Sequence, residues 1–185
     1  MNIPNFISLF RIAAAPVMWL LIYCGYETAF TWLLTAAFFT DIIDGVIARK
    51  LKQVTKLGSV LDSYGDSLTI ISGIAGLVKF NSHLLDVYLS FVMIVVSLHL
   101  IQLFLALWKY GKPSSFHTWS AKLGALAVGM FILVTLHFHF MPWLFYVTIA
   151  ILIMDAIEES ILVFMLPQWK NDVKGIYWIL KQKKI

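Results

Sequence analysis

The sequence predicts an all-α integral membrane protein with six transmembrane helices, both termini in the cytoplasm and a short interfacial C-terminal helix. Two observations support this prediction. Of the 185 residues, 61% are hydrophobic and 13% are charged, and the mean hydropathy is +0.85. This is the composition of a polytopic membrane protein with little material for a soluble domain. The basic residues, in turn, gather in alternate loops, as they do around membrane-spanning helices.

The expected helices follow from hydropathy and length, since crossing a hydrocarbon core of about 30 Å takes roughly 20 helical residues. The uncharged stretch Leu123–Met154 is too long for one span. We divide it before Pro142, because proline suits the first turn of a helix. The six expected helices are then residues 5–24, 28–49, 57–80, 84–109, 120–138 and 142–166.

Lysine and arginine residues set the expected orientation of these helices. In the loops of one side only Lys79 is basic, at a helix edge. The positive-inside rule therefore places the other side, with both termini, in the cytoplasm. This placement explains the formal net charge of +4 without a nucleic acid partner. The basic residues of the cytoplasmic side are Arg49, Lys50, Lys52, Lys56, Lys109, Lys112, Lys122, Lys170, Lys174, Lys181, Lys183 and Lys184.

We expect a single membrane domain over residues 1–185, because the sequence has no internal repeat and no linker rich in proline or glycine. The tail, residues 167–185, follows the last expected span. Its apolar residues recur at helical spacing, which predicts a short amphipathic helix on the membrane surface. A frayed, solvated tail is the alternative. The apolar stripe consists of Val173, Ile176, Tyr177 and Leu180.

Four aspartates lie within 26 residues of otherwise largely apolar sequence. A carboxylate is poorly tolerated by a lipid-facing segment, and the flanks Thr28–Thr40 and Ser67–Val78 carry no charge. The four negative charges need compensation, for which a pair of divalent cations is the natural candidate. The acids belong to one pattern of eight positions: Asp41-x2-Asp44-Gly45-x2-Ala48-Arg49-x8-Gly58-x3-Asp62-x3-Asp66.

The four acids are expected to converge. Helices 28–49 and 57–80 should form an antiparallel hairpin, in which Asp44 and Asp62 are equally far from Gln53. Asp41 and Asp66 are placed almost symmetrically about the same residue, so all four acids reach a similar depth in the hairpin. Oxygen donors from two helices match Mg²⁺ or Mn²⁺ better than zinc. Purely structural acids are the alternative, which this arrangement disfavours.

The remaining positions of the pattern also suit a bound ligand. Gly45 and Ala48 leave room on the acidic face, and Arg49 offers a guanidinium fork for phosphate oxygens. Gly58 permits a tight entry into its helix or leaves further room. The alternatives are helix packing for Gly45 and Ala48 and a topology role for Arg49.

The eight-position pattern resembles, without a mismatch, the signature of the CDP-alcohol phosphotransferase family. The resemblance implies an enzyme that moves a substituted phosphoryl group from a CDP-linked donor to an alcohol and releases CMP. It also implies that Asp66 doubles as the base that deprotonates the acceptor hydroxyl. The implied ligands of two divalent ions, Mg²⁺ or Mn²⁺, are Asp41, Asp44, Asp62 and Asp66. The implied CDP contacts are Gly45, Ala48, Arg49 and Gly58.

The acceptor is suggested by two further stretches, Asn2–Ile12 and Ala48–Lys56, which resemble bacterial phosphatidylglycerophosphate synthases. They favour CDP-diacylglycerol as donor and glycerol 3-phosphate as acceptor. The run Asp62–Ser67 departs from the Asp-Pro-Val-Ala-Asp-Lys usual in those enzymes, and their Arg-Glu pair is missing around His99. Inositol phosphate, serine or another phospholipid therefore stay open as acceptors.

Basic residues outside the pattern are candidates for binding an acceptor phosphate. Lys112, His117 and Lys122 share one expected cytoplasmic loop. The alternative is a loop that only sets topology, with Ser120 capping the next helix. Arg11 could likewise contact phosphate or extend its side chain to the lipid headgroups.

Three further acids lie in the expected helix 142–166, where ionisable groups need partners. Acceptor recognition, a buried structural ion pair and a dimer contact are all open for them. The acids are Asp155, Glu158 and Glu159, and their available partners are Lys122, Arg11 and His99.

We expect a homodimer in the cell (inner) membrane, with its active site facing the cytoplasm. The expected partners are membrane lipids, CDP-diacylglycerol and a small polar alcohol, as in phospholipid biosynthesis. The alternative class is a divalent-cation transporter. A transporter would favour acids at the midplane, broken helices and repeated halves, and Arg49 would oppose the passage of cations.

Overall fold

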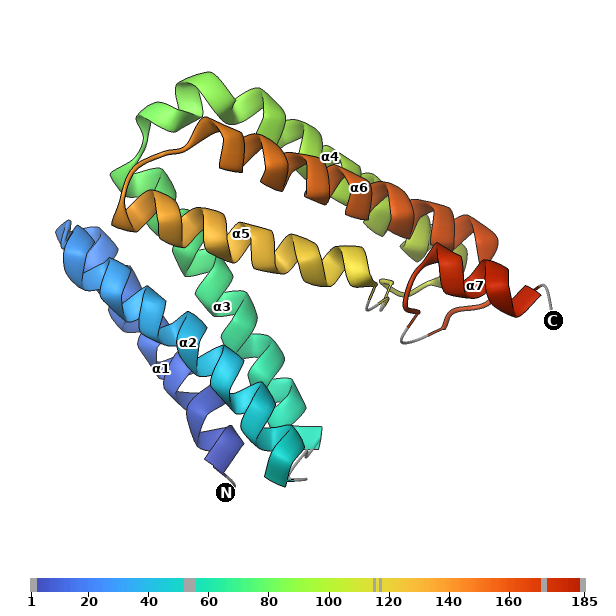
Figure 1. Cartoon of the computed structure of the whole chain (residues 1–185), viewed down its shortest axis with the longest axis horizontal. Helices are drawn as coiled ribbons and strands as arrows, with labels where there is room; N and C mark the ends of the chain where they lie inside the picture. The colour runs from blue at the N-terminus through green and yellow to red at the C-terminus, as the bar shows by residue number, and fades with distance from the viewer. Residues whose placement is uncertain (1–2, 52–55, 115, 117, 171–172, 184–185) are drawn as a thin grey trace. The chain divides into compact units, whose positions relative to one another are not determined.

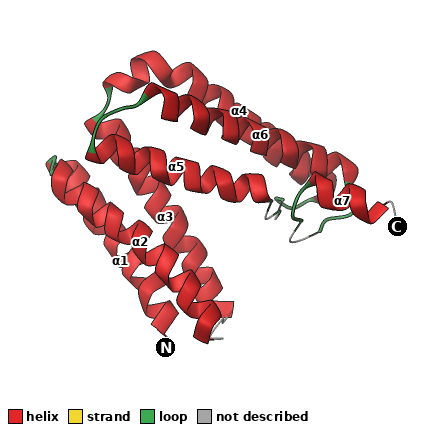
Figure 2. Ribbon diagram, in the orientation of Figure 1, coloured by secondary structure: helices red, strands yellow, loops and turns green. Residues whose placement is uncertain are grey.

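The computed structural model describes residues 3–51, 56–114, 116, 118–170 and 173–183 (Figure 1). Side chains are not described at residues 3–5, 7, 42–51, 56–57, 59, 85 and 182–183. All regular structure in the described part is helical, with loops between the helices (Figure 2). The helices are α1 (Ile3–Cys24), α2 (Glu27–Leu51), α3 (Lys56–Phe80), α4 (His83–Tyr110), α5 (Trp119–His137), α6 (Pro142–Met165) and α7 (Ile176–Lys183).

The all-α prediction is confirmed, and each boundary expected for the six long helices lies within two residues of the observed one. Pro142 begins α6, as its restricted φ angle favours. The prediction that Ser120 caps α5 is wrong. The Ala121 amide donates to Thr118 Oγ1 at 3.0 Å, so Thr118 supplies the cap. Ser120 instead donates to acids of α6.

Two stretches of the described helices are long and apolar enough to cross a membrane. They are Asp86–Tyr110, with a mean hydropathy of 2.3, and Trp119–His137, with 1.7. Large apolar side chains are also exposed along the long helices, as they are on proteins that contact lipid or another protein. Examples are Trp32, Ile74, Phe104, Leu126 and Phe164.

The chain divides into two compact units. One consists of Met1–Leu85 and Ile132–Phe140, and the other of Asp86–Phe131 and Met141–Ile185. The first unit therefore contains α1, α2, all of α3, the first residues of α4 and the end of α5. The second contains most of α4 and α5 together with α6 and α7. The single domain stays a prediction.

In the first unit, α1 packs against both α2 and α3 (Figure 1). It does so more extensively than α2 and α3 pack against each other. The α2–α3 hairpin is antiparallel, because Phe30 near the start of α2 packs against Phe80 at the end of α3, with ring centroids 5.7 Å apart. Gly76 makes room for this packing, since a Cβ added there would overlap the Phe30 ring.

In the second unit, α4 and α6 run in the same direction. The Tyr88 and Phe145 rings lie 4.7 Å apart near the starts of these helices. Near their ends, the Tyr110 hydroxyl donates to the Val163 carbonyl at 2.8 Å. Lys109 Nζ donates to the same carbonyl at 2.8 Å. These contacts satisfy a carbonyl of the last turn of α6, which has no partner within the helix.

The C-terminal helix is found, but the predicted apolar stripe is only partly right. Val173 is buried and Ile176 is partly buried, whereas Tyr177 and Leu180 are exposed. Ile179, outside the predicted stripe, is buried beside the ends of α4 and α6. The face of α7 that packs therefore differs from the face that spacing alone suggested.

Glu158 of α6 holds the start of α7. Its Oε1 accepts a hydrogen bond from the Ile176 amide at 3.0 Å. Gly175 precedes this amide with a φ of +140°, and a Cβ there would lie 2.7 Å from Glu158 Oε1. A negative charge at a helix N-terminus is also favoured by the helix dipole. Glu158 is thus a docking contact for the C-terminal segment.

Glu158→Ala is expected to loosen α7. A hydrogen bond to a charged group contributes about 1.5–3 kcal/mol, so amide exchange in α7 should accelerate by roughly 10- to 100-fold. Hydrogen–deuterium exchange with mass spectrometry measures this. Ser160→Ala is the control, because the Ser160 hydroxyl donates within α6, to the Ala156 carbonyl. Equal exchange in the wild type and Glu158→Ala would contradict the docking role.

Candidate metal-binding site

Three of the four predicted acids meet in the first unit. Asp41 comes from α2, and Asp62 and Asp66 come from α3. Each offers a carboxylate oxygen, and these three oxygens all lie within 4.8 Å of one another. We call these residues the acid cluster. The predicted convergence of α2 and α3 is therefore confirmed for three of the acids.

The acids meet because they lie at matching depths in antiparallel helices. Asp41 is ten residues before the end of α2 at Leu51, and Asp66 is ten residues after the start of α3 at Lys56. At 1.5 Å per residue, both lie about 15 Å from the end of the hairpin. Asp62 is one turn nearer that end, on the same face of α3 as Asp66.

Three carboxylates this close repel one another. Two unit charges 4.8 Å apart repel by about 3.5 kcal/mol at an effective dielectric constant near 20, before screening by solvent. The cluster therefore needs a cation to stay together in its ionised form.

Arg11 of α1 supplies a positive charge to all three acids. Its Nη1 donates to Asp41 Oδ1 at 2.8 Å. Its Nη2 donates to Asp62 Oδ1 and lies 3.1 Å from Asp66 Oδ1. A guanidinium suits this task because its planar fork presents several donors at once and stays protonated.

Arg11 and the acids differ sharply in exposure. The Arg11 side chain is 0% exposed, whereas those of Asp41, Asp62 and Asp66 are 43%, 44% and 42% exposed. The guanidinium thus lies on the buried side of the acid cluster, and the carboxylates stay open on another side. The proposal that Arg11 extends to the headgroups is wrong, because a headgroup-seeking side chain would be exposed.

Gly65 allows α1 to approach the acid cluster. It lies on α3 between Asp62 and Asp66 and is buried. A Cβ at this position would lie 3.0 Å from Arg11 Nε and 3.5 Å from the Ser8 carbonyl oxygen. A larger residue would therefore press directly on the arginine.

The chemistry of the cluster fits a hard divalent cation. Among the described residues, the candidate ligands of the cluster are all carboxylate oxygens, and Mg²⁺ and Mn²⁺ prefer oxygen donors. With all three carboxylates ionised, the formal charges of the acid cluster and Arg11 add up to −2. The cluster therefore remains attractive to a divalent ion.

Part of the eight-position pattern lies beyond the described side chains. Asp44, Gly45, Ala48 and Arg49 belong to α2, but their side chains fall outside the described part, so their contacts stay predictions. Gly58 lies in the first turn of α3 and is partly buried.

The candidate acceptor residues are only partly described. His117 lies outside the described residues. Lys112 and Lys122 are exposed, and each ammonium lies near an aromatic ring. The Nζ atom of Lys112 is 5.5 Å from the centre of the Trp169 ring, and that of Lys122 is 5.3 Å from the centre of the Trp119 ring. Their acceptor role stays a prediction.

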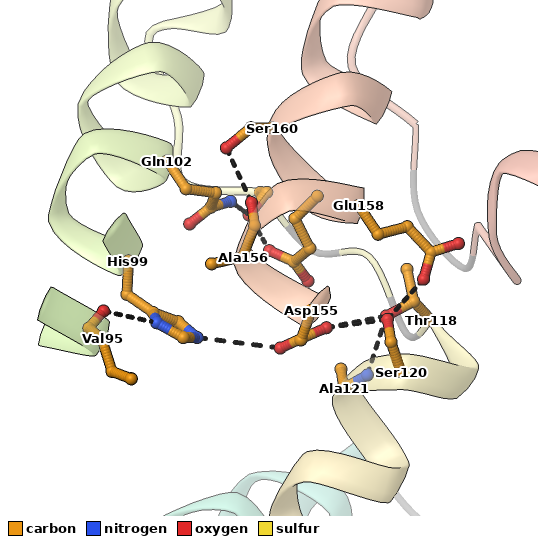
Figure 3. A network of polar contacts seen from close by, with 12 residues as sticks. Val95, His99, Gln102, Thr118, Ser120, Ala121, Asp155, Ala156, Glu158 and Ser160 are labelled. Atoms are coloured by element: carbon orange, nitrogen blue, oxygen red, sulfur yellow. Dashed lines mark hydrogen bonds and ion pairs between the residues drawn. The ribbon is translucent and has the colours of Figure 1, made fainter. Parts of the chain in front are cut away.

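A second polar network lies in the other unit (Figure 3). His99 Nε2 is 3.7 Å from Asp155 Oδ2, which confirms His99 as a partner of the acids in α6. Ser120 lies 2.9 Å from Asp155 Oδ1 and also donates to Glu158. Thr118 adds a longer contact to Asp155, at 3.4 Å.

Glu159 completes this network. Its Oε2 accepts a hydrogen bond from Ser114 at 3.3 Å, and Ser114 accepts one from Gln102 at 2.6 Å. The three acids of α6 thus join α4, α5, α7 and the loop before α5 through polar contacts. Of the two other proposed partners, Arg11 instead contacts the acid cluster and Lys122 lies beside Trp119. These contacts favour a structural role for the acids.

The pairing of Arg11 with the acid cluster is the feature that sequence reasoning missed. A signal was available, because Arg11 lies eight residues after the start of α1 at Ile3. This depth is close to that of Asp41 and Asp66, each ten residues from the hairpin end of its helix. Comparing depths across all three helices, and not only within the hairpin, would have suggested the contact.

Comparison with known proteins agrees with the resemblance noted from the eight-position pattern. Residues 1–154 match the model of the CDP-alcohol phosphatidyltransferase family. The matched region includes every position of the pattern as well as Arg11.

Individual relatives match shorter regions. A CDP-diacylglycerol–glycerol-3-phosphate 3-phosphatidyltransferase of Pseudomonas fluorescens is 34% identical over 45% of this chain and 45% of its own length. A CDP-diacylglycerol–inositol 3-phosphatidyltransferase of Saccharomyces cerevisiae is 40% identical over 42% of this chain and 33% of its own length. The match thus spans less than half the length of these two relatives.

A third relative aligns from end to end. The CDP-diacylglycerol–glycerol-3-phosphate 3-phosphatidyltransferase of Aquifex aeolicus is 25% identical over 98% of this chain and 100% of its own length. No solved structure matches the chain. The family model covers most of the chain, including the acid cluster, and the chain therefore belongs to the CDP-alcohol phosphatidyltransferase family.

Proposed function

We propose that this protein transfers a phosphatidyl group from CDP-diacylglycerol to an alcohol, with glycerol 3-phosphate as the acceptor. The observation that carries the proposal is the acid cluster, which lies at positions of the family's pattern and retains a net negative charge. Relatives named for glycerol 3-phosphate support this acceptor. The yeast relative named for inositol shows that the matching region also occurs with another acceptor.

The proposed reaction is a single displacement at phosphorus. The acceptor hydroxyl oxygen forms a bond to the phosphorus that carries diacylglycerol, and the bond from that phosphorus to the CMP oxygen breaks. CMP leaves with the electron pair of that bond. Asp66 takes the proton of the acceptor hydroxyl, as a positioned carboxylate does in general base catalysis.

The acid cluster and Asp44 would hold two divalent ions. When bound, such ions neutralise charge on the attacking and leaving oxygens of a phosphoryl transfer. Gly45, Ala48, Arg49 and Gly58 would surround the CDP moiety, with the Arg49 guanidinium on its phosphate oxygens. Lys112, His117 and Lys122 would bind the acceptor phosphate.

The proposed setting is the cell (inner) membrane. Six spans with cytoplasmic termini would place the open side of the acid cluster near the cytoplasmic interface. A lipid tail could then remain in the bilayer while a polar acceptor arrives from water. We also propose a homodimer. A cation transporter is not favoured, because family membership supports a transferase.

The test is a transfer assay with the purified full-length protein in lipid nanodiscs. Labelled CDP-diacylglycerol is offered with glycerol 3-phosphate, inositol phosphate, inositol, serine or phosphatidylglycerol. We expect CMP release and lipid product with glycerol 3-phosphate. Release should be at least tenfold slower with inositol and serine, which carry no phosphate, because one phosphate contact contributes about 1.5–3 kcal/mol. CMP release that depends on a different alcohol would keep the reaction class and overturn the acceptor. Absence of CMP release with every alcohol would contradict the reaction class.

A further inference from the structure

The described contacts between Arg11 and the acid cluster all reach the Oδ1 oxygen of a carboxylate. The contacts join Nη1 to Asp41 Oδ1 at 2.8 Å and Nη2 to Asp66 Oδ1 at 3.1 Å, with Asp62 Oδ1 also on Nη2. A carboxylate has two oxygens and about four acceptor positions. It can therefore accept a hydrogen bond from arginine and bind a cation at the same time.

The position of Arg11 agrees with such simultaneous binding. Its side chain is fully buried, whereas the three acids keep about two-fifths of their surface exposed. A cation from solvent would reach the exposed side of the carboxylates, away from the guanidinium. Entry of a cation thus does not require Arg11 to leave.

The charges lead to the same conclusion. An arginine side chain does not lose its proton in proteins, so Arg11 carries its positive charge before and after a cation arrives. With the three acids ionised, the formal charge of −2 on the acids and Arg11 together attracts a divalent ion. Burial of a charge is costly unless it is paired, and these carboxylates compensate the charge of the fully buried Arg11.

We propose that Arg11 is a positioning residue, which holds Asp41, Asp62 and Asp66 in a metal-binding arrangement from the buried side and stays in place when the metal binds. Partners of this kind orient the ligands of many metal sites. The inference rests on the proposed function, because it takes the acid cluster to be the metal site. The opposing model is a placeholder, in which Arg11 occupies the position of the cation and must leave.

The two models predict opposite changes in metal affinity. Loss of the Arg11 charge alone should strengthen cation binding, because a nearby positive charge repels a cation. Loss of positioning should weaken it. Weaker binding in a neutral variant therefore cannot come from the charge change.

The experiment measures Mn²⁺ binding to the full-length protein in nanodiscs by electron paramagnetic resonance. For Arg11→Met we expect binding about 10- to 100-fold weaker than in the wild type, the usual effect of removing a residue that orients metal ligands. Arg11→Lys keeps the charge but loses the fork, and should fall between the two. Gly65→Ala presses on an intact Arg11 and should also weaken binding, because an added Cβ would lie 3.0 Å from Nε.

Met18→Ala is the control for damage to α1. Met18 is fully buried in the same helix, and shortening it should lower thermal stability without changing Mn²⁺ affinity. If Arg11→Met does not fold, Arg11→Lys and Gly65→Ala decide the question. The positioning role would be overturned if these variants lost no more Mn²⁺ affinity than a Met18→Ala protein of equal thermal stability.

The remaining outcomes separate this inference from the proposed function. Unchanged or tighter Mn²⁺ binding in Arg11→Met would overturn the positioning role and leave the transfer reaction intact. A wild-type protein that binds Mn²⁺ but releases no CMP, with weak binding in Arg11→Met, would support Arg11 and overturn the reaction. A wild-type protein that binds no Mn²⁺ would overturn both.

Discussion

Chelation of divalent ions is expected to abolish CMP release, and Mg²⁺ or Mn²⁺ should restore it. Without metal ions, the acid cluster keeps a net negative charge where the donor's pyrophosphate has to bind. Metal ions contribute several kcal/mol to such a transfer, so the rate should fall by about 10³-fold or more. The measurement is CMP release from CDP-diacylglycerol in excess EDTA and after each metal is added back.

A second sample, treated with EDTA already saturated with Mg²⁺, controls for effects of the chelator on the lipid or the protein. It should keep full activity. Tryptophan fluorescence of the EDTA-treated protein checks that the helices remain folded. Full turnover in excess free chelator would exclude the metal-dependent reaction, whatever the affinity of the acid cluster for cations.

Asp66→Asn is expected to lower kcat by about 10²- to 10⁴-fold, the usual contribution of a general base. The amide keeps the size of the side chain but cannot take the acceptor proton. Affinity for the CDP donor should fall much less, because Asp41 and Asp62 remain to hold metal. The measurements are kcat for CMP release and donor affinity from binding of a non-reactive CDP analogue.

Asp86→Asn is the matched control, since Asp86 is an exposed acid in the first turn of α4. This variant should keep kcat within about twofold of the wild type, because Asp86 is not part of the acid cluster. It should also stay folded, since a surface substitution changes stability by only about 0.5 kcal/mol. Near-normal kcat in Asp66→Asn would show that another group is the base. Equal losses of kcat and donor affinity would make Asp66 a metal ligand alone.

Much of the fold could be predicted from the sequence, because the deciding forces are local. A long apolar segment has to pair its backbone groups within itself in lipid, so each apolar run becomes a helix. Charges, prolines and basic loops then mark where the helices end. This is why the predicted 57–80 and 142–166 match α3 and α6 within one residue at each end.

The acid cluster was predictable for a related reason. Asp41 and Asp66 are nearly symmetric about the short connection between two helices. An antiparallel hairpin has to bring such positions to the same depth, whatever the rest of the chain does. The helical period then puts Asp62 on the same face as Asp66.

The tertiary structure alone decided which partners the charged and capping groups find. Arg11 had several candidate partners in the sequence, and the packing of α1 against both α2 and α3 brought it to the acid cluster. Likewise, Thr118 caps α5, whereas the Ser120 hydroxyl contacts acids of α6. Spacing along the chain specifies depth and face within one helix. The choice of partner depends on which helices pack side by side. That packing depends on many contacts between side chains that lie far apart in the sequence.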